Sequence, residues 1–87
     1  MKKITMFAMA SCPYCKQAHT WMKELFAAFP QYSEIPLLII DEVQNPETAE
    51  KYDYYYVPTY YMEDTKVHEG AATYEIISEV FKKAMNA

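Results

Sequence analysis

Apolar residues follow different periodicities along the first half of this chain, and the changes between them mark the expected strands and helices. Residues 2–8 carry apolar side chains on both faces, as in a strand that is covered on both sides. Residues 13–29 show apolar positions at helical intervals, and Pro30 ends the helix that they predict. Residues 36–41 contain a short aliphatic run whose length and β-branching favour a buried parallel strand. Together these segments predict one right-handed strand–helix–strand unit.

The second half of the chain predicts a short helix, a hairpin and a final helix. Residues 45–47 (Asn-Pro-Glu) stand in the usual order of cap, first-turn proline and first-turn acid, so a short helix should run to about Tyr52. Residues 59–63 and 67–69 are strand candidates joined by a tight turn. Thr73 can cap the last helix. The apolar stripe of that helix comprises Ile76, Ile77, Val80, Phe81 and Ala84.

Composition and charge narrow the class of protein. With 87 residues, of which 52% are apolar, the chain is long enough for one small α/β domain over residues 1–87 with the element order βαβαββα. Its net charge is −4, it has no arginine, and its lysines never cluster beyond a pair, which argues against nucleic-acid binding. The N-terminal segment resembles a secretory signal but falls short of the usual ~15–30 residues, and no apolar run approaches the ~20 residues of a membrane span. We therefore expect a cytoplasmic protein that binds neither nucleic acid nor membranes.

Cys12 and Cys15 are the only cysteines, and they lie between the first predicted strand and the first predicted helix. Residues three apart share one helix face, so the two sulfurs can come within disulfide reach. Pro13 suits the first helical position, and Cys12 lies at the helix start, where free N–H groups and the helix dipole favour a thiolate. Because a bridge across two residues adds little stability, redox turnover is the better explanation. We expect Cys12 to be the nucleophile and Cys15 the resolving thiol, with Tyr14 beside the reactive sulfur.

A zinc site is the alternative use of these thiols. A tetrahedral ligand set would comprise Cys12, Cys15, His19 and His68. His19 is more simply explained as a half-exposed helix residue, and His68 as a surface residue of the hairpin. We therefore expect no metal, and a zinc-binding or partner-binding module without turnover stays as the alternative outside enzymes.

Six tyrosines lie within residues 52–61. As strand-forming residues they are expected to pack under the first and last helices, with their hydroxyls reaching the surface. The alternative is an amphipathic surface beside Cys12 that grips partner proteins.

Residues 12–15 (Cys-Pro-Tyr-Cys) at a strand-to-helix junction, residues 57–59 (Val-Pro-Thr) at the start of the third strand, and the element order together resemble the thioredoxin superfamily, at this size its glutaredoxin-like branch. The resemblance covers essentially the whole chain. It implies a thioredoxin fold, with a four-stranded mixed sheet and three flanking helices. The implied activity is thiol–disulfide oxidoreduction of disulfide-containing protein or small-molecule substrates, with the Cys12–Cys15 disulfide as the redox-active group and no bound cofactor. An iron–sulfur cluster shared between two chains also occurs in the family, but the rigid Pro13 argues against it here.

The same resemblance implies which residues bind a substrate. The bond between Val57 and Pro58 would be cis and would face Cys12, which leaves the Val57 backbone free to pair with an extended substrate chain. The expected substrate-binding positions are Pro13, Tyr14, Lys16, Val57, Pro58, Thr59, Ala72 and Thr73.

The expected electron donor follows from departures from the glutathione-using relatives. Those glutaredoxins resemble one another in a basic residue three positions before the first cysteine and in a Gly-Gly pair followed by Asp before the last helix. This chain has Met9 and residues 69–73 (Glu-Gly-Ala-Ala-Thr) at these places. Lys16 and the N–H groups of Ala72 and Thr73 can still meet the carboxylates of glutathione. We expect a monomer that is reduced by thioredoxin reductase, with a glutathione-dependent glutaredoxin as the alternative.

Overall fold

A computed structural model describes residues 1–87 and contains a four-stranded sheet in the order β2-β1-β3-β4. The strands are β1 (Ile4–Ala8), β2 (Leu37–Asp41), β3 (Thr59–Met62) and β4 (Thr65–Glu69). β2 pairs in parallel with β1, whereas β3 pairs antiparallel with both β1 and β4. The mixed sheet that the resemblance implied is therefore confirmed.

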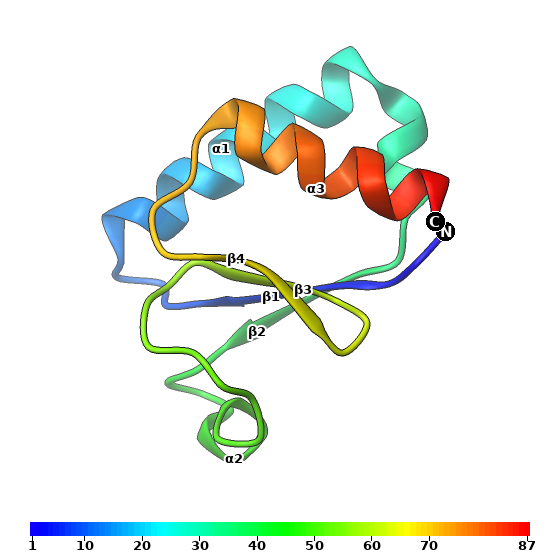
Figure 1. Cartoon of the computed structure of the whole chain (residues 1–87). Helices are drawn as coiled ribbons and strands as arrows, with labels where there is room; N and C mark the ends of the chain where they lie inside the picture. Colours follow the sequence, from blue (N-terminus) through cyan, green and yellow to red (C-terminus); the bar gives the residue numbers. More distant parts are fainter.

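The helices lie on both sides of this sheet. They are α1 (Pro13–Ala28), the 3-10 helix η1 (Pro30–Glu34), α2 (Pro46–Ala49) and α3 (Tyr74–Asn86). Figure 1 shows α1 and α3 over one face of the sheet and α2 on the opposite side. This is the α/β thioredoxin fold that the resemblance implied, with η1 as an element that the sequence pattern did not predict. None of the helices combines the length and the apolar character needed to cross a bilayer.

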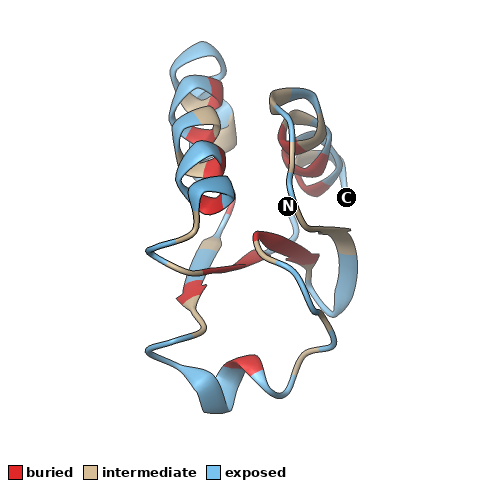
Figure 2. Cartoon of the chain, turned by 90° about the vertical axis from the view of Figure 1, so that its left-hand side faces the viewer, coloured by how far each residue is buried: buried red, intermediate tan, exposed pale blue.

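β1 is a central strand, and its alternating side chains contribute to two separate cores. All five of its residues are buried, as predicted for a strand that is covered on both faces. Ile4, Met6 and Ala8 belong to the larger core, which lies under α1 and α3. The two helices contribute Ala18, Met22, Leu25, Ile77, Val80, Phe81 and Ala84. Figure 2 shows the buried positions of α1 and α3 on the sides that face each other.

The opposite face of the sheet carries a smaller, aromatic core. It comprises Phe7, Ile40, Ala49 and Tyr61. The centroid of the Phe7 ring lies 4.7 Å from that of Tyr52, 4.8 Å from that of Tyr54 and 5.9 Å from that of Tyr61. These separations are the favourable range for aromatic pairs, so the segment between α2 and β3 is held to the sheet by ring contacts.

The tyrosines of residues 52–61 therefore divide between the two faces, and their expected packing under α1 and α3 is correct only for Tyr60. The expectation is wrong for Tyr52, Tyr54 and Tyr61, which pack in the smaller core on the other face. Side chains alternate along a strand, so the neighbours Tyr60 and Tyr61 must point to opposite faces. The Tyr60 hydroxyl does not reach the surface but is buried without a hydrogen-bond partner. The most exposed tyrosines are Tyr55, at 86%, and Tyr56, at 70%.

β2 forms in parallel with β1 as expected, but it is not the buried strand that its aliphatic run predicted. Leu38 and Ile39 are 47% and 43% exposed, and only Ile40 is buried. The reason is position, because β2 is an edge strand and the four-residue α2 covers only part of one face.

α2 is also shorter than predicted, because it ends at Ala49 instead of continuing to Tyr52. The N–H groups of Lys51 and Tyr52 bond three residues back, to the carbonyls of Thr48 at 3.2 Å and Ala49 at 3.1 Å, so the chain continues as a tighter turn. Asn45 does not cap the helix with its side chain; its amide donates instead to the Asp41 carbonyl at 3.3 Å.

The last helix begins as predicted. The hydroxyl of Thr73 accepts a hydrogen bond from the Ile76 N–H at 3.1 Å, which caps α3. The hairpin before it is tighter than predicted, because β3 ends at Met62 and Glu63 turns the chain with a left-handed φ of 53°.

Candidate active site

The two cysteines lie between the end of β1 and the first turn of α1. Cys12 precedes the helix with φ −83° and ψ 121°, and Pro13 occupies the first turn. The Cys12 N–H donates to the Met9 carbonyl at 3.1 Å, which orders the loop between them. Both thiols are free, with Cys12 half-buried and Cys15 only 1% exposed. An approaching disulfide can therefore reach Cys12 and not Cys15.

The surroundings of Cys12 favour its thiolate. The pKa of the Cys12 thiol is lowered, chiefly by the backbone N–H of Cys15, while partial burial opposes this effect. The Cys15 thiol and the Tyr14 N–H lower the same pKa further, and the negative charge of Glu42 raises it. The protonated thiol points at a backbone carbonyl, with 4.0 Å between Cys12 Sγ and Val57 O. Cys12 is thus placed to ionise at a lower pH than an ordinary cysteine.

The surroundings of Cys15 have the opposite effect. Burial raises the pKa of the Cys15 thiol to about 11, although the Met9 N–H donates to Cys15 Sγ at 3.5 Å and lowers it. The adjacent Cys12 sulfur and the Glu42 carboxylate add to the rise. Cys15 therefore stays protonated at neutral pH, and the two thiols differ in both access and charge.

This difference can be measured by alkylation. We expect iodoacetamide to modify Cys12 alone at neutral pH, with a midpoint in the pH dependence below that of a free cysteine peptide measured alongside. In the Cys12→Ser variant, alkylation of the folded protein at Cys15 should rise only toward pH 11. Mass spectrometry after timed quenching gives both rates, and equal modification of the two thiols at pH 7 would contradict the assignment.

The Val57–Pro58 bond is cis, as the resemblance implied. Pro58 is buried, and its carbonyl accepts a hydrogen bond from the Gly70 N–H at 2.9 Å. The N–H and carbonyl of Val57 form no backbone hydrogen bond, so an extended chain can pair with them. Thr59 is fully buried and its hydroxyl donates to the Tyr56 carbonyl, so its side chain supports this segment from inside.

A groove between α1 and the segment before α3 brings together several more of the expected site residues. It is lined by Pro13, Tyr14, Gln17, Trp21, Ala71 and Ala72. Tyr14 is 60% exposed at this groove. Lys16 is exposed and does not line it, and the Thr73 hydroxyl is occupied by the N–H of Ile76. The sequence pattern did not indicate Trp21, which follows Tyr14 by seven residues, or about two helical turns, and so shares its side of α1.

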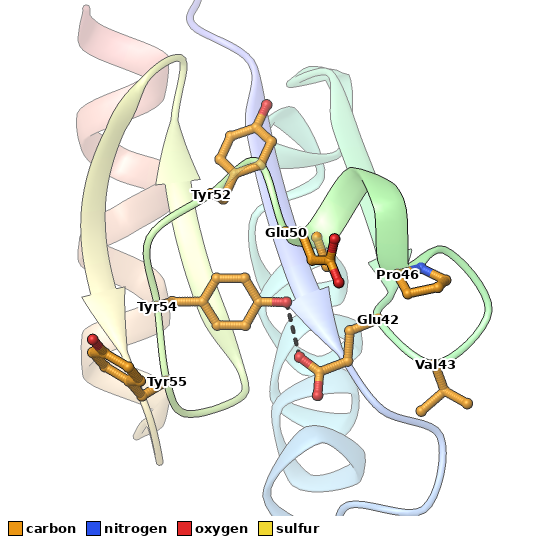
Figure 3. Close-up of a pocket in the computed structure, with 8 residues that line it drawn as sticks. Glu42, Val43, Pro46, Glu50, Tyr52, Tyr54 and Tyr55 are labelled. Atoms are coloured by element: carbon orange, nitrogen blue, oxygen red, sulfur yellow. Dashed lines mark hydrogen bonds between the residues drawn. The ribbon is translucent and has the colours of Figure 1, made fainter.

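A carboxylate that the sequence pattern did not single out acts on both cysteines. Glu42 directly follows β2, and its N–H donates to the Ala8 carbonyl at 3.0 Å. Its Oε1 accepts a hydrogen bond from the Tyr54 hydroxyl at 2.8 Å (Figure 3). The charge of this carboxylate raises the pKa of both Cys12 and Cys15. The strand order alone could have indicated Glu42, because the residues that follow two adjacent parallel strands lie at the same edge of a sheet.

The four residues of the zinc alternative are not gathered into a ligand set. No group of three or more His, Cys, Asp or Glu side chains is placed to hold a metal ion. His68 lies in β4, where its Nε2 stands 3.1 Å from the Gly70 carbonyl and 3.0 Å from the Ala71 carbonyl. Because both neighbours are acceptors, this nitrogen carries a proton and donates to them, which leaves it without a lone pair for a metal.

Comparisons with known proteins agree with this geometry. A family model described as a thioredoxin domain matches residues 2–82. A thioredoxin of Methanocaldococcus jannaschii is 30% identical over 83 residues, which are 95% of each chain. The solution structure of oxidised thioredoxin from Plasmodium falciparum is similar with a TM-score of 0.70 and 20% identity over 92% of this chain and 77% of that one. A structure titled as that of a malarial protein has a TM-score of 0.69 and 21% identity over 94% of each chain.

Proposed function

This chain belongs to the thioredoxin-domain family, a family of thiol–disulfide oxidoreductases, and we propose that it reduces protein or small-molecule disulfides by dithiol–disulfide exchange. The observation that carries the proposal is the unequal environment of the two thiols. Cys12 is accessible with a lowered pKa, whereas Cys15 is buried with a raised one. A nucleophile and a resolving thiol need this difference in access and pKa. The nucleophile must attack an external disulfide, whereas the resolving thiol must react only after the mixed disulfide has formed.

The proposed reaction has two exchange steps. The Cys12 thiolate attacks one sulfur of the substrate disulfide, and the substrate S–S bond breaks as the Cys12–substrate bond forms. The Cys15 thiol then loses its proton to the released substrate thiolate and attacks the Cys12 sulfur. The second substrate thiolate leaves and takes up a proton, so two electrons pass to the substrate and the Cys12–Cys15 pair becomes a disulfide.

Substrate docking is proposed to use the residues that surround Cys12. An extended substrate segment would pair with the free backbone groups of Val57, whose carbonyl lies 4.0 Å from Cys12 Sγ. Apolar substrate side chains would lie in the groove that Tyr14 and Trp21 line. The contribution of Pro13, Pro58 and Ala72 is then the shape of the docking surface, because none of these residues offers a charged group. We further propose that the protein acts as a cytoplasmic monomer.

The proposed electron donor is thioredoxin reductase, with glutathione as the alternative. Glutathione carries carboxylates, and the positions that would meet them hold the uncharged Met9 and Ala72. The net charge of −4 also disfavours an anionic tripeptide. The match over 95% of a thioredoxin supports the same choice, since the likeness is to thioredoxin along the whole chain.

Two coupled assays test the activity and the donor together. Disulfide reduction is followed with NADPH and thioredoxin reductase, and in parallel with glutathione and glutathione reductase. We expect turnover in the first assay and little in the second. Met9→Lys should raise the glutathione-dependent rate about twofold to fivefold, the range of a single exposed ion pair, and should leave the rate with thioredoxin reductase nearly unchanged.

Met9→Leu is the matched control, because it changes the side chain without adding charge. An equal gain in both variants would remove charge pairing as the explanation. Ready turnover of the wild type with glutathione and none with thioredoxin reductase would show that this is a glutathione-dependent glutaredoxin. Turnover in neither assay would overturn the proposed oxidoreductase activity.

A further inference from the structure

A hollow lies between α2 and the tyrosine-rich segment, and of its lining residues only Glu42 has a role in the exchange chemistry, through its charge beside the cysteines. Its lining includes Pro46, Glu42, Glu50, Tyr52, Tyr54 and Tyr55. Figure 3 shows the carboxylate groups of Glu42 and Glu50 on the side to which the Tyr54 hydroxyl points. The hollow thus combines two negative charges with aromatic walls, a combination that favours an organic cation over an anion or a purely apolar group.

No cation of the chain itself neutralises these carboxylates. The only ion pair joins Lys66 to Glu69, at 2.7 Å. Glu42 accepts one hydrogen bond, from the Tyr54 hydroxyl, and Glu50 accepts none. Acceptor capacity and charge therefore remain for a ligand.

The hollow adjoins the cysteine pair through a short, fixed stretch of chain. Tyr55 precedes Val57 by two residues, so their Cα atoms lie no more than about 7.6 Å apart. The N–H groups of Tyr55 and Tyr56 donate to Glu69 Oε2 at 2.6 and 3.1 Å, which holds this stretch against β4. Val57 O in turn lies 4.0 Å from Cys12 Sγ.

We infer that this hollow binds a lysine or arginine side chain of the disulfide-containing substrate and so makes the enzyme selective for cystines with a nearby basic residue. The inference rests on the proposed function. A substrate segment paired with Val57 advances about 3.3 Å per residue, so a residue two or three positions from its reacting cysteine would reach Tyr55. The net charge of −4 favours the encounter with such a segment.

The test uses the pre-reduced protein, whose own dithiol supplies the two electrons. The substrates are disulfide-linked dimers of a short peptide that carries lysine, arginine, norleucine or glutamate two residues from its cysteine. Acid quenching and mass spectrometry give the second-order rate constants, each divided by the rate with dithiothreitol to remove intrinsic differences in reactivity. We expect the lysine and arginine peptides to react about fivefold faster than the norleucine peptide, and the glutamate peptide more slowly. The advantage should fall steeply toward ~1 M salt, because exposed charges are then screened within about 3 Å.

Matched variants locate the effect. Glu50→Gln should bring the lysine-to-norleucine ratio close to one, and Tyr55→Leu should lower it in part. Glu47→Gln also removes one negative charge, three residues earlier in α2 and outside the hollow, and it should keep the ratio.

Three results bear against the inference in different ways. An equal loss in Glu47→Gln and Glu50→Gln would attribute selectivity to net charge and overturn the site. Equal wild-type rates for the lysine and norleucine peptides would overturn the site while the exchange activity stands. A wild type that reduces none of the peptides would overturn the proposed function itself.

Discussion

Replacing Cys12 by serine should abolish disulfide reduction completely, whereas replacing Cys15 by serine should accumulate a mixed disulfide between Cys12 and the substrate. The reason is that only Cys12 is both accessible and favoured as a thiolate, while Cys15 is 1% exposed. A serine hydroxyl at position 12 does not ionise at neutral pH and cannot start the exchange. A serine at position 15 allows the first step and removes the second.

Mass spectrometry of the quenched reaction distinguishes these outcomes. The Cys15→Ser protein should carry one substrate chain on Cys12, and dithiothreitol should release it. Circular dichroism of both variants provides the control for folding. A wild-type adduct on Cys15 with Cys12 unmodified would contradict the assignment, as would residual turnover of Cys12→Ser above the rate without protein.

The features that the sequence predicted well are those that local physical chemistry determines. The first helix starts at Pro13 because proline suits a first turn and cannot continue a strand interior, and Thr73 caps α3 because its hydroxyl can meet a free N–H. The two faces of β1 follow from alternation alone. The cis bond at Pro58 was different in kind, because it came from a resemblance and not from any local pattern.

The features that the sequence did not predict depend on where an element lies in the sheet. The aliphatic run around Leu38 has the composition of a buried strand, but its exposure is set by the edge position of β2, which needs the whole strand order to be known. The faces to which Tyr60 and Tyr61 point depend on the register of β3 against β1. Because the neighbouring residues are both tyrosines, no alternation of polar and apolar side chains indicated which of the two faces the larger core.

In the candidate site, too, some features follow from the local sequence and others from the tertiary structure. The helix start of Cys12 could be located from four consecutive residues, but the burial that raises the pKa of Cys15 comes from tertiary packing. Glu42 was missed because it follows Cys15 by 27 positions in the sequence, and only the pairing of β1 with β2 brings the two together. A sequence motif therefore located the proposed nucleophile, while the groups that tune its pKa came from the fold.

Replacing Phe7 by alanine should have a large effect on stability, and it tests whether the aromatic core organises the face that carries the proposed cation site. Phe7 is fully buried, and its ring contacts Tyr52, Tyr54 and Tyr61. Truncation of a buried phenylalanine typically lowers the free energy of unfolding by about 3–5 kcal/mol, a large part of the ~5–15 kcal/mol available to a small domain.

Urea unfolding followed by circular dichroism measures this loss, and Tyr55→Ala is the control, because a side chain that is 86% exposed should contribute within about 0.5 kcal/mol. A loss below about 1 kcal/mol in Phe7→Ala would mean that the tyrosine segment closes the cavity by moving, since the cost depends on how far a site can collapse. A full loss instead means that Tyr54 is held rigidly by Phe7. The Tyr54 hydroxyl is the group that fixes the Glu42 carboxylate, so a rigid aromatic core would also fix the position of the negative charge beside the cysteines.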